Sequence, residues 1–218
     1  MQVLRVVWDW NGTLFDDLHV VVEAVNRGIS PWGVNPITLQ DYRDHYTRPV
    51  KDFYSAIFGR PVSDGEWVEL DQRFHAGYTE MLDRAVLNAD AREALEKVRG
   101  AGVPQSLLSM FPHEDLVPIV DRMGIAEFFD RIDGLRGPTG GMKAAYLETH
   151  LRELIGDLDP GQVLVVGDTP DDAMAADHVG ASCVLFDNGS HHRAELEATG
   201  APVVTSLREA VERVVGPE

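Results

Sequence analysis

A short apolar segment that ends abruptly in a carboxylate constrains the fold of this chain more than any other feature. Val3 to Trp8 is rich in β-branched residues and alternates little, which is typical of a strand buried on both faces. Asp9-Trp10-Asn11-Gly12-Thr13 follows directly. Because open parallel sheets carry their ligand sites at the carboxyl ends of strands, we expect Asp9 to lie in such a site.

The rest of the pattern divides the chain into two regions. Between Asp16 and Val86 only helical spacing is found, including a capping-box signature at Ser63 and Glu66. From about Asn88 strand and helix patterns alternate, which indicates an α/β fold with a doubly wound parallel sheet. We therefore expect a Rossmann-like core at 1–15 and 88–218, and an inserted α-helical domain at 16–87.

The expected elements of the two regions are short and closely spaced. The helices of the first region are expected at 18–29, 38–46, 50–58 and 63–85. In the second region strands are expected at 103–109, 131–133, 162–166, 181–185 and 203–204. The helices between them are expected at 91–100, 113–123, 142–155, 171–179, 195–198 and 207–215.

Composition excludes several classes of function. The formal net charge of -17 disfavours nucleic-acid binding through a general basic surface, and any anion site must be built locally. No apolar run approaches the length of a membrane span, so a soluble cytoplasmic protein is expected. The single cysteine, Cys183, stands in an expected strand, where a buried structural thiol is the simpler interpretation.

Four residues with useful chemistry stand near strand ends or the start of a helix. Asp9, Ser109 and Asp168 each follow an apolar strand, and Lys143 begins a helix after the glycine-rich segment 137–141. Carboxylates and a backbone carbonyl can hold Mg²⁺, whereas a hydroxyl and a lysine can hold phosphoryl oxygens. Each residue alone has a plainer explanation as a turn, a cap or a solvated side chain, so only their joint occurrence indicates a site for a metal and a phosphate.

Four motifs in this order resemble the haloacid dehalogenase superfamily of Mg²⁺-dependent phosphohydrolases, in the phosphoglycolate phosphatase-like branch with a helical cap after the first motif. The second motif of that family is a Ser or Thr that ends a strand, and the third is a lysine. The matching segments are Asp9-Trp10-Asn11-Gly12-Thr13, Leu107-Leu108-Ser109-Met110, Gly141-Met142-Lys143 and Gly167-Asp168-Thr169-Pro170-Asp171-Asp172.

The resemblance implies a role for each matching residue. Asp9 would be the nucleophile that becomes an aspartyl-phosphate and, with the Asn11 carbonyl, Asp168 and Asp172, would hold Mg²⁺. Thr13 would position the nucleophile. Ser109 and Lys143 would bind the phosphate of a small phosphorylated metabolite. The chain is thus expected to be an enzyme, a phosphatase of this family.

One residue departs from the family pattern. Asn11 stands where the family has the acid that protonates the leaving oxygen, and a carboxamide cannot transfer a proton in that way. Three outcomes stay open: a preference for good leaving groups, a proton donor elsewhere, or binding of a phosphorylated ligand without useful turnover. His19, His45 and His75 of the helical region are the candidates for a donor elsewhere.

The helical region is expected to set substrate specificity as a cap over the site. Arg48, in a loop between helices, could bind a substrate anion. Lys51 is the only lysine of this region. In the related phosphonate hydrolases a cap lysine forms a Schiff base, so phosphonate hydrolysis remains a minor alternative. His191-His192 resembles a metal-binding pair, but an exposed loop is the simpler interpretation.

Overall fold

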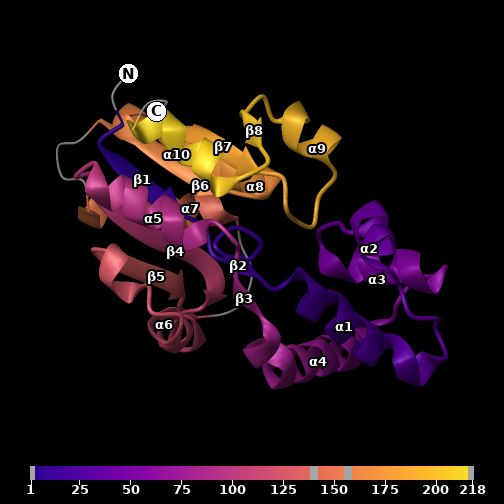
Figure 1. Ribbon diagram of the computed structural model, residues 1–218. Helices are drawn as coiled ribbons and strands as arrows, with labels where there is room; N and C mark the ends of the chain where they lie inside the picture. Colours follow the sequence, from indigo (N-terminus) through magenta and orange to yellow (C-terminus); the bar gives the residue numbers. More distant parts are fainter. Residues whose placement is uncertain (1–2, 138–141, 155–158, 216–218) are drawn as a thin grey trace. The chain divides into compact units, whose positions relative to one another are not determined.

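A six-stranded sheet of order β5-β4-β1-β6-β7-β8 forms the centre of the core (Figure 1). Every neighbouring pair in it is parallel. Its strands are β1 (Arg5–Trp8), β4 (Gln105–Pro112), β5 (Arg131–Leu135), β6 (Val163–Gly167), β7 (Ser182–Phe186) and β8 (Val203–Val204). Because β1 lies between β4 and β6, all its residues are buried, as the apolar pattern predicted.

The computed structural model describes residues 3–137, 142–154 and 159–215. The chain divides into two compact units. The core unit comprises Met1–Phe15, Leu87–Gly189 and Arg193–Glu218, and the helical unit comprises Asp16–Val86 and Ser190–His192. Assignment of Ser190–His192 to the helical unit differs from the expected boundaries, which gave all of 88–218 to the core.

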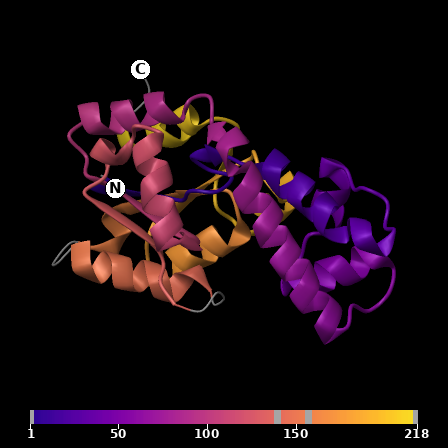
Figure 2. The same cartoon turned by 90° about the horizontal axis from the view of Figure 1, so that it is seen from below.

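Helices cover both faces of the sheet, so the core has three layers (Figure 2). On one face α5 (Ala91–Gly100) packs with α10 (Leu207–Val215). On the other face α7 (Lys143–Leu154) packs with α8 (Pro170–Val179). The remaining core helices are α6 (His113–Arg122), α9 (Arg193–Ala198) and the short 3₁₀ helices at Ala126–Phe128 and Pro160–Gln162.

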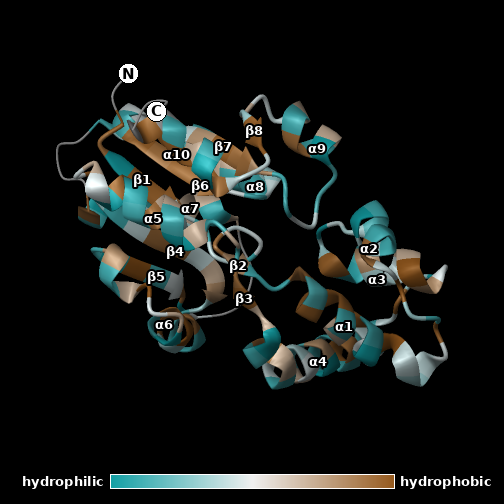
Figure 3. Cartoon of the chain, in the orientation of Figure 1, coloured by the Kyte–Doolittle hydropathy of each residue, from teal (hydrophilic) through white to brown (hydrophobic). Residues whose placement is uncertain are grey.

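The apolar face of α7 and α8 explains how these helices are held on the sheet. Leu147 and Leu151 of α7 pack with Val7 of β1 and Val165 of β6 in a buried cluster. Figure 3 shows the same division, with hydrophobic residues along the strands and hydrophilic residues on the outer sides of the helices. Burial of this surface is the main stabilising contribution of the core.

The helical unit has its own apolar core. It contains α1 (Leu18–Ile29), α2 (Leu39–His45), α3 (Val50–Phe58) and α4 (Asp64–Met81), with 3₁₀ turns at Ser30–Trp32 and Leu82–Arg84. Val25, Ile29, Phe53 and Leu70 are among its buried residues. The capping box predicted at the start of α4 is present: Ser63 accepts a hydrogen bond from the Glu66 backbone N–H, and the Glu66 carboxylate accepts one from Ser63.

Three local features differ from the expected elements. The strand expected to end at Ser109 continues to Pro112, with a shift of register against β5 between Leu108 and Pro112. The segments that link the two units form a small sheet of β2 (Phe15–Asp16) and β3 (Val86–Leu87), which the helical pattern of this region did not predict. The helix expected at 142–155 is α7, and Ile155 lies outside the described residues.

Among the described residues, no helix is both long enough and apolar enough to span a membrane.

Candidate active site

The loop after β1 holds Asp9 at the carboxyl end of the sheet. The Asp9 backbone N–H donates to the Val166 carbonyl of β6 at 2.8 Å, which fixes the start of the loop. The Trp10 carbonyl accepts hydrogen bonds from the backbone of Thr13 and Phe15. Asp9 is 8% exposed, so the loop presents a nearly buried carboxylate at the edge where parallel-sheet proteins bind ligands.

Gly12 and Gly189 allow two loops to close around Asp168, which follows β6. A Cβ at Gly12 would lie 2.3 Å from Oδ2 of Asp168, and one at Gly189 would lie 2.4 Å from the same atom. Gly12 also has a φ of 73°, which favours glycine. Thr13 donates its hydroxyl to Oδ1 of Asp168 at 3.0 Å. Thr13 therefore holds Oδ1 of Asp168, and the two glycines leave no room for a larger residue beside Oδ2.

Lys143 links Asp9 to Asp172. Its Nζ donates to Oδ1 of Asp172 at 2.5 Å and also to Oδ1 of Asp9. Lys143 is the first residue of α7, and its backbone N–H donates to Oδ2 of Asp171 at 3.4 Å. The side chain is only 5% exposed, so its charge is compensated by these buried carboxylates.

Asp172 is fixed by the start of α8. Its Oδ2 accepts from the backbone and the hydroxyl of Thr169, at 3.0 and 2.7 Å, in a capping box. A Cβ at Gly167 would lie 2.2 Å from Cγ of Asp172, so this position requires glycine. With Oδ2 held by the cap, Oδ1 remains directed at Lys143.

Burial and mutual repulsion shape the charges of this cluster. Burial raises the pKa of Asp9 to about 6, against the opposing effect of Lys143. Burial, together with the charges of Asp9 and Asp172, also raises the pKa of Asp168 well above its usual value. Burial acts in the same direction on Asp172, but Lys143 outweighs it and lowers the pKa of Asp172. Burial alone would lower the pKa of Lys143, yet the two carboxylates raise it.

The donor set fits a divalent cation. Oxygen atoms of Asp9, Asp168 and Asp172 all lie within 4.8 Å of one another. With all three carboxylates ionised, the site and the Lys143 ammonium would carry a net charge of −2, which is costly to bury without a further cation. Hard carboxylate oxygens are the ligands preferred by Mg²⁺, so these residues could hold that ion.

Ser109 and Asn11 lie on segments next to this cluster. Ser109 is 2% exposed at the register shift of β4, and its hydroxyl oxygen accepts from the Phe111 backbone N–H at 3.0 Å. Bulges of this kind redirect a side chain near many active sites. Asn11 is half-buried in the loop after β1 and forms an isolated bridge with Phe15.

A family model for haloacid dehalogenase-like hydrolases matches residues 4–180. This range includes the three carboxylates of the cluster and Lys143. The chain belongs to the haloacid dehalogenase-like hydrolases. This match and the relatives named phosphoglycolate phosphatase confirm the predicted family and the prediction of an enzyme of its phosphatase branch. The parallel sheet and a solved structure with the same fold confirm the predicted α/β fold.

Relatives and solved structures cover nearly the whole of this hydrolase. It is 26% identical to a phosphoglycolate phosphatase of Pseudomonas fluorescens over 97% of this chain and 80% of that protein. A phosphoglycolate phosphatase of Pseudomonas syringae pv. tomato is 30% identical over 94% and 78% of the two chains. A haloacid dehalogenase-like hydrolase from Streptococcus pneumoniae shares the fold, with a TM-score of 0.82, 20% identity and coverage of 96% and 97%.

The structure brings five of the candidate site residues of this hydrolase together in the core unit. Asp9, Thr13, Lys143, Asp168 and Asp172 lie in one connected cluster. Arg48 belongs to the helical unit, where it is exposed. The candidate proton donors of that unit are also exposed at His19, His45 and His75. The 138–141 part of the glycine-rich segment lies outside the described residues.

Two asparagine side chains that support the loop after β1 through hydrogen bonds were not identified from the sequence. Asn88 donates from Nδ2 to the Thr13 carbonyl at 2.6 Å, and its Oδ1 accepts from Asn188 at 2.8 Å. Asn188 precedes Gly189, which contacts Asp168. In the sequence both asparagines have the pattern of ordinary turn residues, and only their juxtaposition reveals the connection.

His191 and His192 are half-buried, whereas an exposed loop was expected from the sequence. Within the helical unit, His192 Nε2 lies 2.8 Å from Oδ1 of Asp44, and the His191 ring packs against Tyr46. These contacts account for the grouping of Ser190–His192 with the helical unit.

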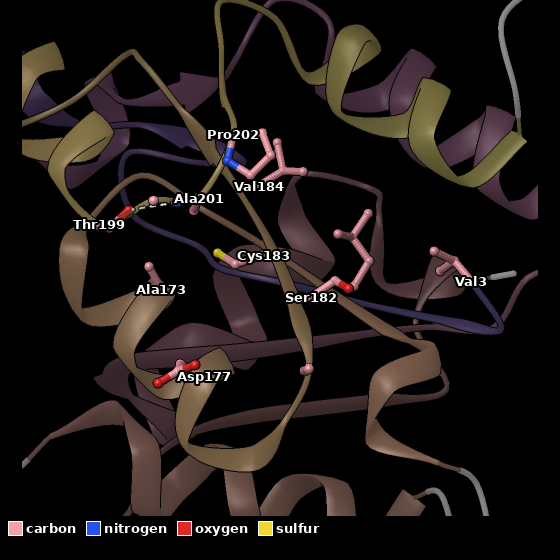
Figure 4. Close-up of a pocket in the computed structure, with 12 residues that line it drawn as sticks. Val3, Ala173, Asp177, Ser182, Cys183, Val184, Thr199, Ala201 and Pro202 are labelled. Carbon is pink, nitrogen blue, oxygen red and sulfur yellow. Dashed lines mark hydrogen bonds between the residues drawn. The ribbon is translucent and has the colours of Figure 1, made fainter. Parts of the chain in front are cut away.

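A surface cavity of about 480 Å³ lies apart from the acidic cluster (Figure 4). It is lined by Ala173 and Asp177 of α8, by Cys183 of β7 and by the Thr199–Pro202 loop, and none of the candidate site residues line it. Burial raises the pKa of the Cys183 thiol, so the thiol stays protonated at neutral pH. Cys183 is half-buried in the strand, consistent with a structural thiol.

Proposed function

We propose that this hydrolase is a Mg²⁺-dependent phosphatase of a small phosphorylated metabolite and that Asp9 is its nucleophile. The observation that carries the proposal is the Lys143 ammonium held between Asp9 and Asp172 beside the buried Asp168. A carboxylate, a cation and a metal-binding acid in one buried site are the groups that phosphoryl transfer requires. Relatives named phosphoglycolate phosphatase support the same class of substrate.

In the proposed reaction a carboxylate oxygen of Asp9 attacks phosphorus. The ester P–O bond breaks, the alcohol leaves with a proton from solvent or a second group, and Asp9 carries an acyl phosphate. Water then attacks the phosphorus, which releases inorganic phosphate and restores the Asp9 carboxylate. Lys143 and Ser109 bind the phosphoryl oxygens, and Thr13 keeps Asp168 in place. Bound Mg²⁺ would neutralise charge on the phosphoryl group.

The residues proposed to hold that ion are Asp9, Asp168, Asp172 and the backbone carbonyl of Asn11. For Asp172 the capping box with Thr169 supports an orienting role, because one carboxylate oxygen is already used there. The helical unit is proposed as a specificity cap. Its exposed Arg48 is the proposed contact for a substrate anion.

A second candidate function follows from Asn11 itself. Without an acid at this position the chain could bind a phosphorylated ligand and turn it over slowly, since loss of a general acid–base group typically costs about 10² to 10⁴ in rate. For the phosphonate alternative, Lys51 forms an ion pair with Asp64 at 2.5 Å. A free lysine amine, which a Schiff base requires, is therefore not favoured there.

The test is phosphate release from a panel that includes phosphoglycolate, simple alkyl phosphates, an acyl phosphate and a phosphonate. Each is assayed with Mg²⁺ and with a chelator, for the wild type and for Asp9→Asn. Asp177→Asn is the matched control, because this exposed aspartate lies on α8 away from the cluster. We expect Mg²⁺-dependent release by the wild type and the control, and none by Asp9→Asn. Equal release by all three proteins would contradict the proposal.

Asn11→Asp separates the two candidate functions. If the missing proton donor limits a phosphatase, this substitution raises alkyl phosphate hydrolysis by roughly 10² or more and changes acyl phosphate hydrolysis much less. If another residue already supplies the proton, the rates do not change. Mg²⁺-dependent ligand binding without turnover in the wild type would instead favour the binding function.

A further inference from the structure

His113 and Arg136 meet at the carboxyl ends of β4 and β5, and their contact has an unusual hydrogen-bond balance. The Gly134 backbone N–H points at Nδ1 of His113 at 3.1 Å. A backbone N–H can only donate, so Nδ1 must be the accepting nitrogen without a proton. In this tautomer the ring proton of His113 is on Nε2.

The other side of the ring faces a second donor. Nη2 of Arg136 lies 2.7 Å from Nε2 of His113. A guanidinium has donors only, and Nε2 also carries a proton, so two donors face each other. The arrangement becomes favourable when one acceptor receives both N–H groups. An anionic oxygen is the acceptor that matches a guanidinium best.

The backbone around this pair is specifically shaped. β4 shifts register against β5 between Leu108 and Pro112, which carries the chain to His113 beside β5. A Cβ at Gly134 would lie 2.6 Å from both the His113 Cα and the Phe111 carbonyl oxygen. Only glycine permits this approach, and the approach is what brings the Gly134 N–H to His113.

Arg136 retains the capacity to bind an anion. Its ion pair with Asp133 is long, because Oδ1 of Asp133 lies 3.5 Å from Nη1. Asp133 receives closer hydrogen bonds from Arg131 and His150, so its charge is shared among several cations and donors. The Arg136 side chain is 61% exposed and can therefore be reached by a ligand.

The pair lies at the same edge of the sheet as Asp9. All strands of the six-stranded sheet are parallel, and β5 is separated from β1 by β4 alone. Two strand spacings amount to about 10 Å, which a long arginine side chain can partly bridge. A molecule with its phosphoryl group at Asp9 could thus place another group near His113 and Arg136.

We propose that His113 and Arg136 form a subsite for a second acidic group, a carboxylate or a phosphate, on the phosphomonoester that is hydrolysed at Asp9. The inference rests on the proposed phosphatase function and narrows its substrates to small phosphorylated acids. With a formal net charge of -17, the chain attracts no anion at long range, so a locally built pair of donors is needed for such a substrate.

The kinetic test compares phosphorylated hydroxy acids of increasing chain length, beginning with phosphoglycolate, with alkyl phosphates of the same length. Arg136→Gln is expected to raise KM for the acids roughly tenfold to a hundredfold, to leave kcat nearly unchanged, and to leave the alkyl phosphates unaffected. His113→Phe should act in the same direction more weakly, because it removes a neutral donor. Arg152→Gln, an exposed arginine of α7, is the matched control.

A binding test keeps the subsite separate from the phosphatase proposal. Calorimetry with Asp9→Asn, alone and combined with Arg136→Gln, measures ligand affinity with the proposed nucleophile removed. Arg136→Gln should weaken the binding of phosphoglycolate or its longer analogues. The affinities for ethyl phosphate and inorganic phosphate should stay unchanged. If Asp9→Asn and the double variant bind every acid with equal affinity, the subsite is overturned even if phosphatase activity is found. Equal weakening of inorganic phosphate would also overturn it, because the pair would then bind the transferred group.

Discussion

Lys143 and Asp172 are joined by a contact of 2.5 Å between Nζ and Oδ1, and the same Nζ also donates to Asp9. Both partners are nearly inaccessible, at 5% and 1% exposure. The lysine is thus the buried counter-ion of two carboxylates, one from the loop after β1 and one from the first turn of α8. In the proposed reaction the same ammonium group also binds the phosphoryl oxygens, so its loss should affect both stability and activity.

Replacing Lys143 by Met should destabilise the fold by about 3–5 kcal/mol, because Asp9 and Asp172 would remain buried without their cation. Urea unfolding with and without Mg²⁺ measures the effect, and added Mg²⁺ should recover part of the loss. Lys97→Met is the matched control, since this residue of α5 pairs with Glu93 at 4.0 Å on the surface. Similar losses for both substitutions would argue against the buried counter-ion.

Mg²⁺ should stabilise the wild type by mass action. At a free concentration near a hundred times Kd the expected gain is about 2.7 kcal/mol. Asp168→Asn should remove most of this gain while the protein remains folded, because it deletes one of the three gathered carboxylates. The measurement is the unfolding free energy against Mg²⁺ concentration. A gain in Asp168→Asn equal to that of the wild type would place the ion elsewhere.

Gly189→Ala should disturb Asp168 without adding or removing any ionisable group. The new Cβ would lie 2.4 Å from Oδ2 of Asp168, and the carboxylate would have to move. We expect Mg²⁺ affinity to fall by about tenfold or more, with destabilisation of about 1–3 kcal/mol. Gly100→Ala has open space around it and should be neutral or slightly stabilising. Unchanged Mg²⁺ affinity in Gly189→Ala would contradict the close approach.

His150 should make stability fall in mild acid. Burial lowers the pKa of this histidine, although the hydrogen bond to Asp133 at 2.7 Å partly offsets the effect. The unfolded chain has the ordinary value near 6.5, so below that pH it binds a proton that the folded chain does not. Stability is therefore retained above this value and lost as the pH falls below it.

The comparison of unfolding free energies at pH 7.5 and 5.5, roughly one unit either side of that value, tests this linkage. The wild type should lose more stability across the interval than His150→Asn, by at most about 1.4 kcal/mol per pH unit. His75→Asn, an exposed histidine of α4, serves as the control. An equal loss in the wild type and His150→Asn would show that other groups cause the acid sensitivity.

The sequence predicted the parallel sheet and the convergence of strand ends because both follow from local patterns. Asp9 and Asp168 end apolar strands, and parallel pairing brings such ends to one edge. The position of Lys143 followed from its place in the order of the motifs. Its contact with two carboxylates could be seen only in three dimensions.

Other features depend on contacts between segments that local patterns do not encode. The Asn88–Asn188 hydrogen bond joins residues far apart in the chain, and neither belongs to a motif. The shift of register after Leu108 lengthens β4 beyond the expected end at Ser109. Gly189 reads as a turn residue, and its approach to Asp168 is set by packing of a distant loop.

The most direct test of the central claim is chemical trapping of the acyl phosphate on Asp9. The reaction with a hydrolysed substrate is quenched in acid and treated with borohydride, which reduces an aspartyl-phosphate to homoserine. Peptide mass spectrometry then locates the changed residue. Asn11 cannot act as a general acid or base, so with a substrate whose leaving group needs no proton, such as an acyl phosphate, the intermediate should form readily, be hydrolysed slowly and accumulate in the wild type. We predict homoserine at position 9. Phosphate release from the substrate while Asp9 stays unmodified would contradict the proposed nucleophile.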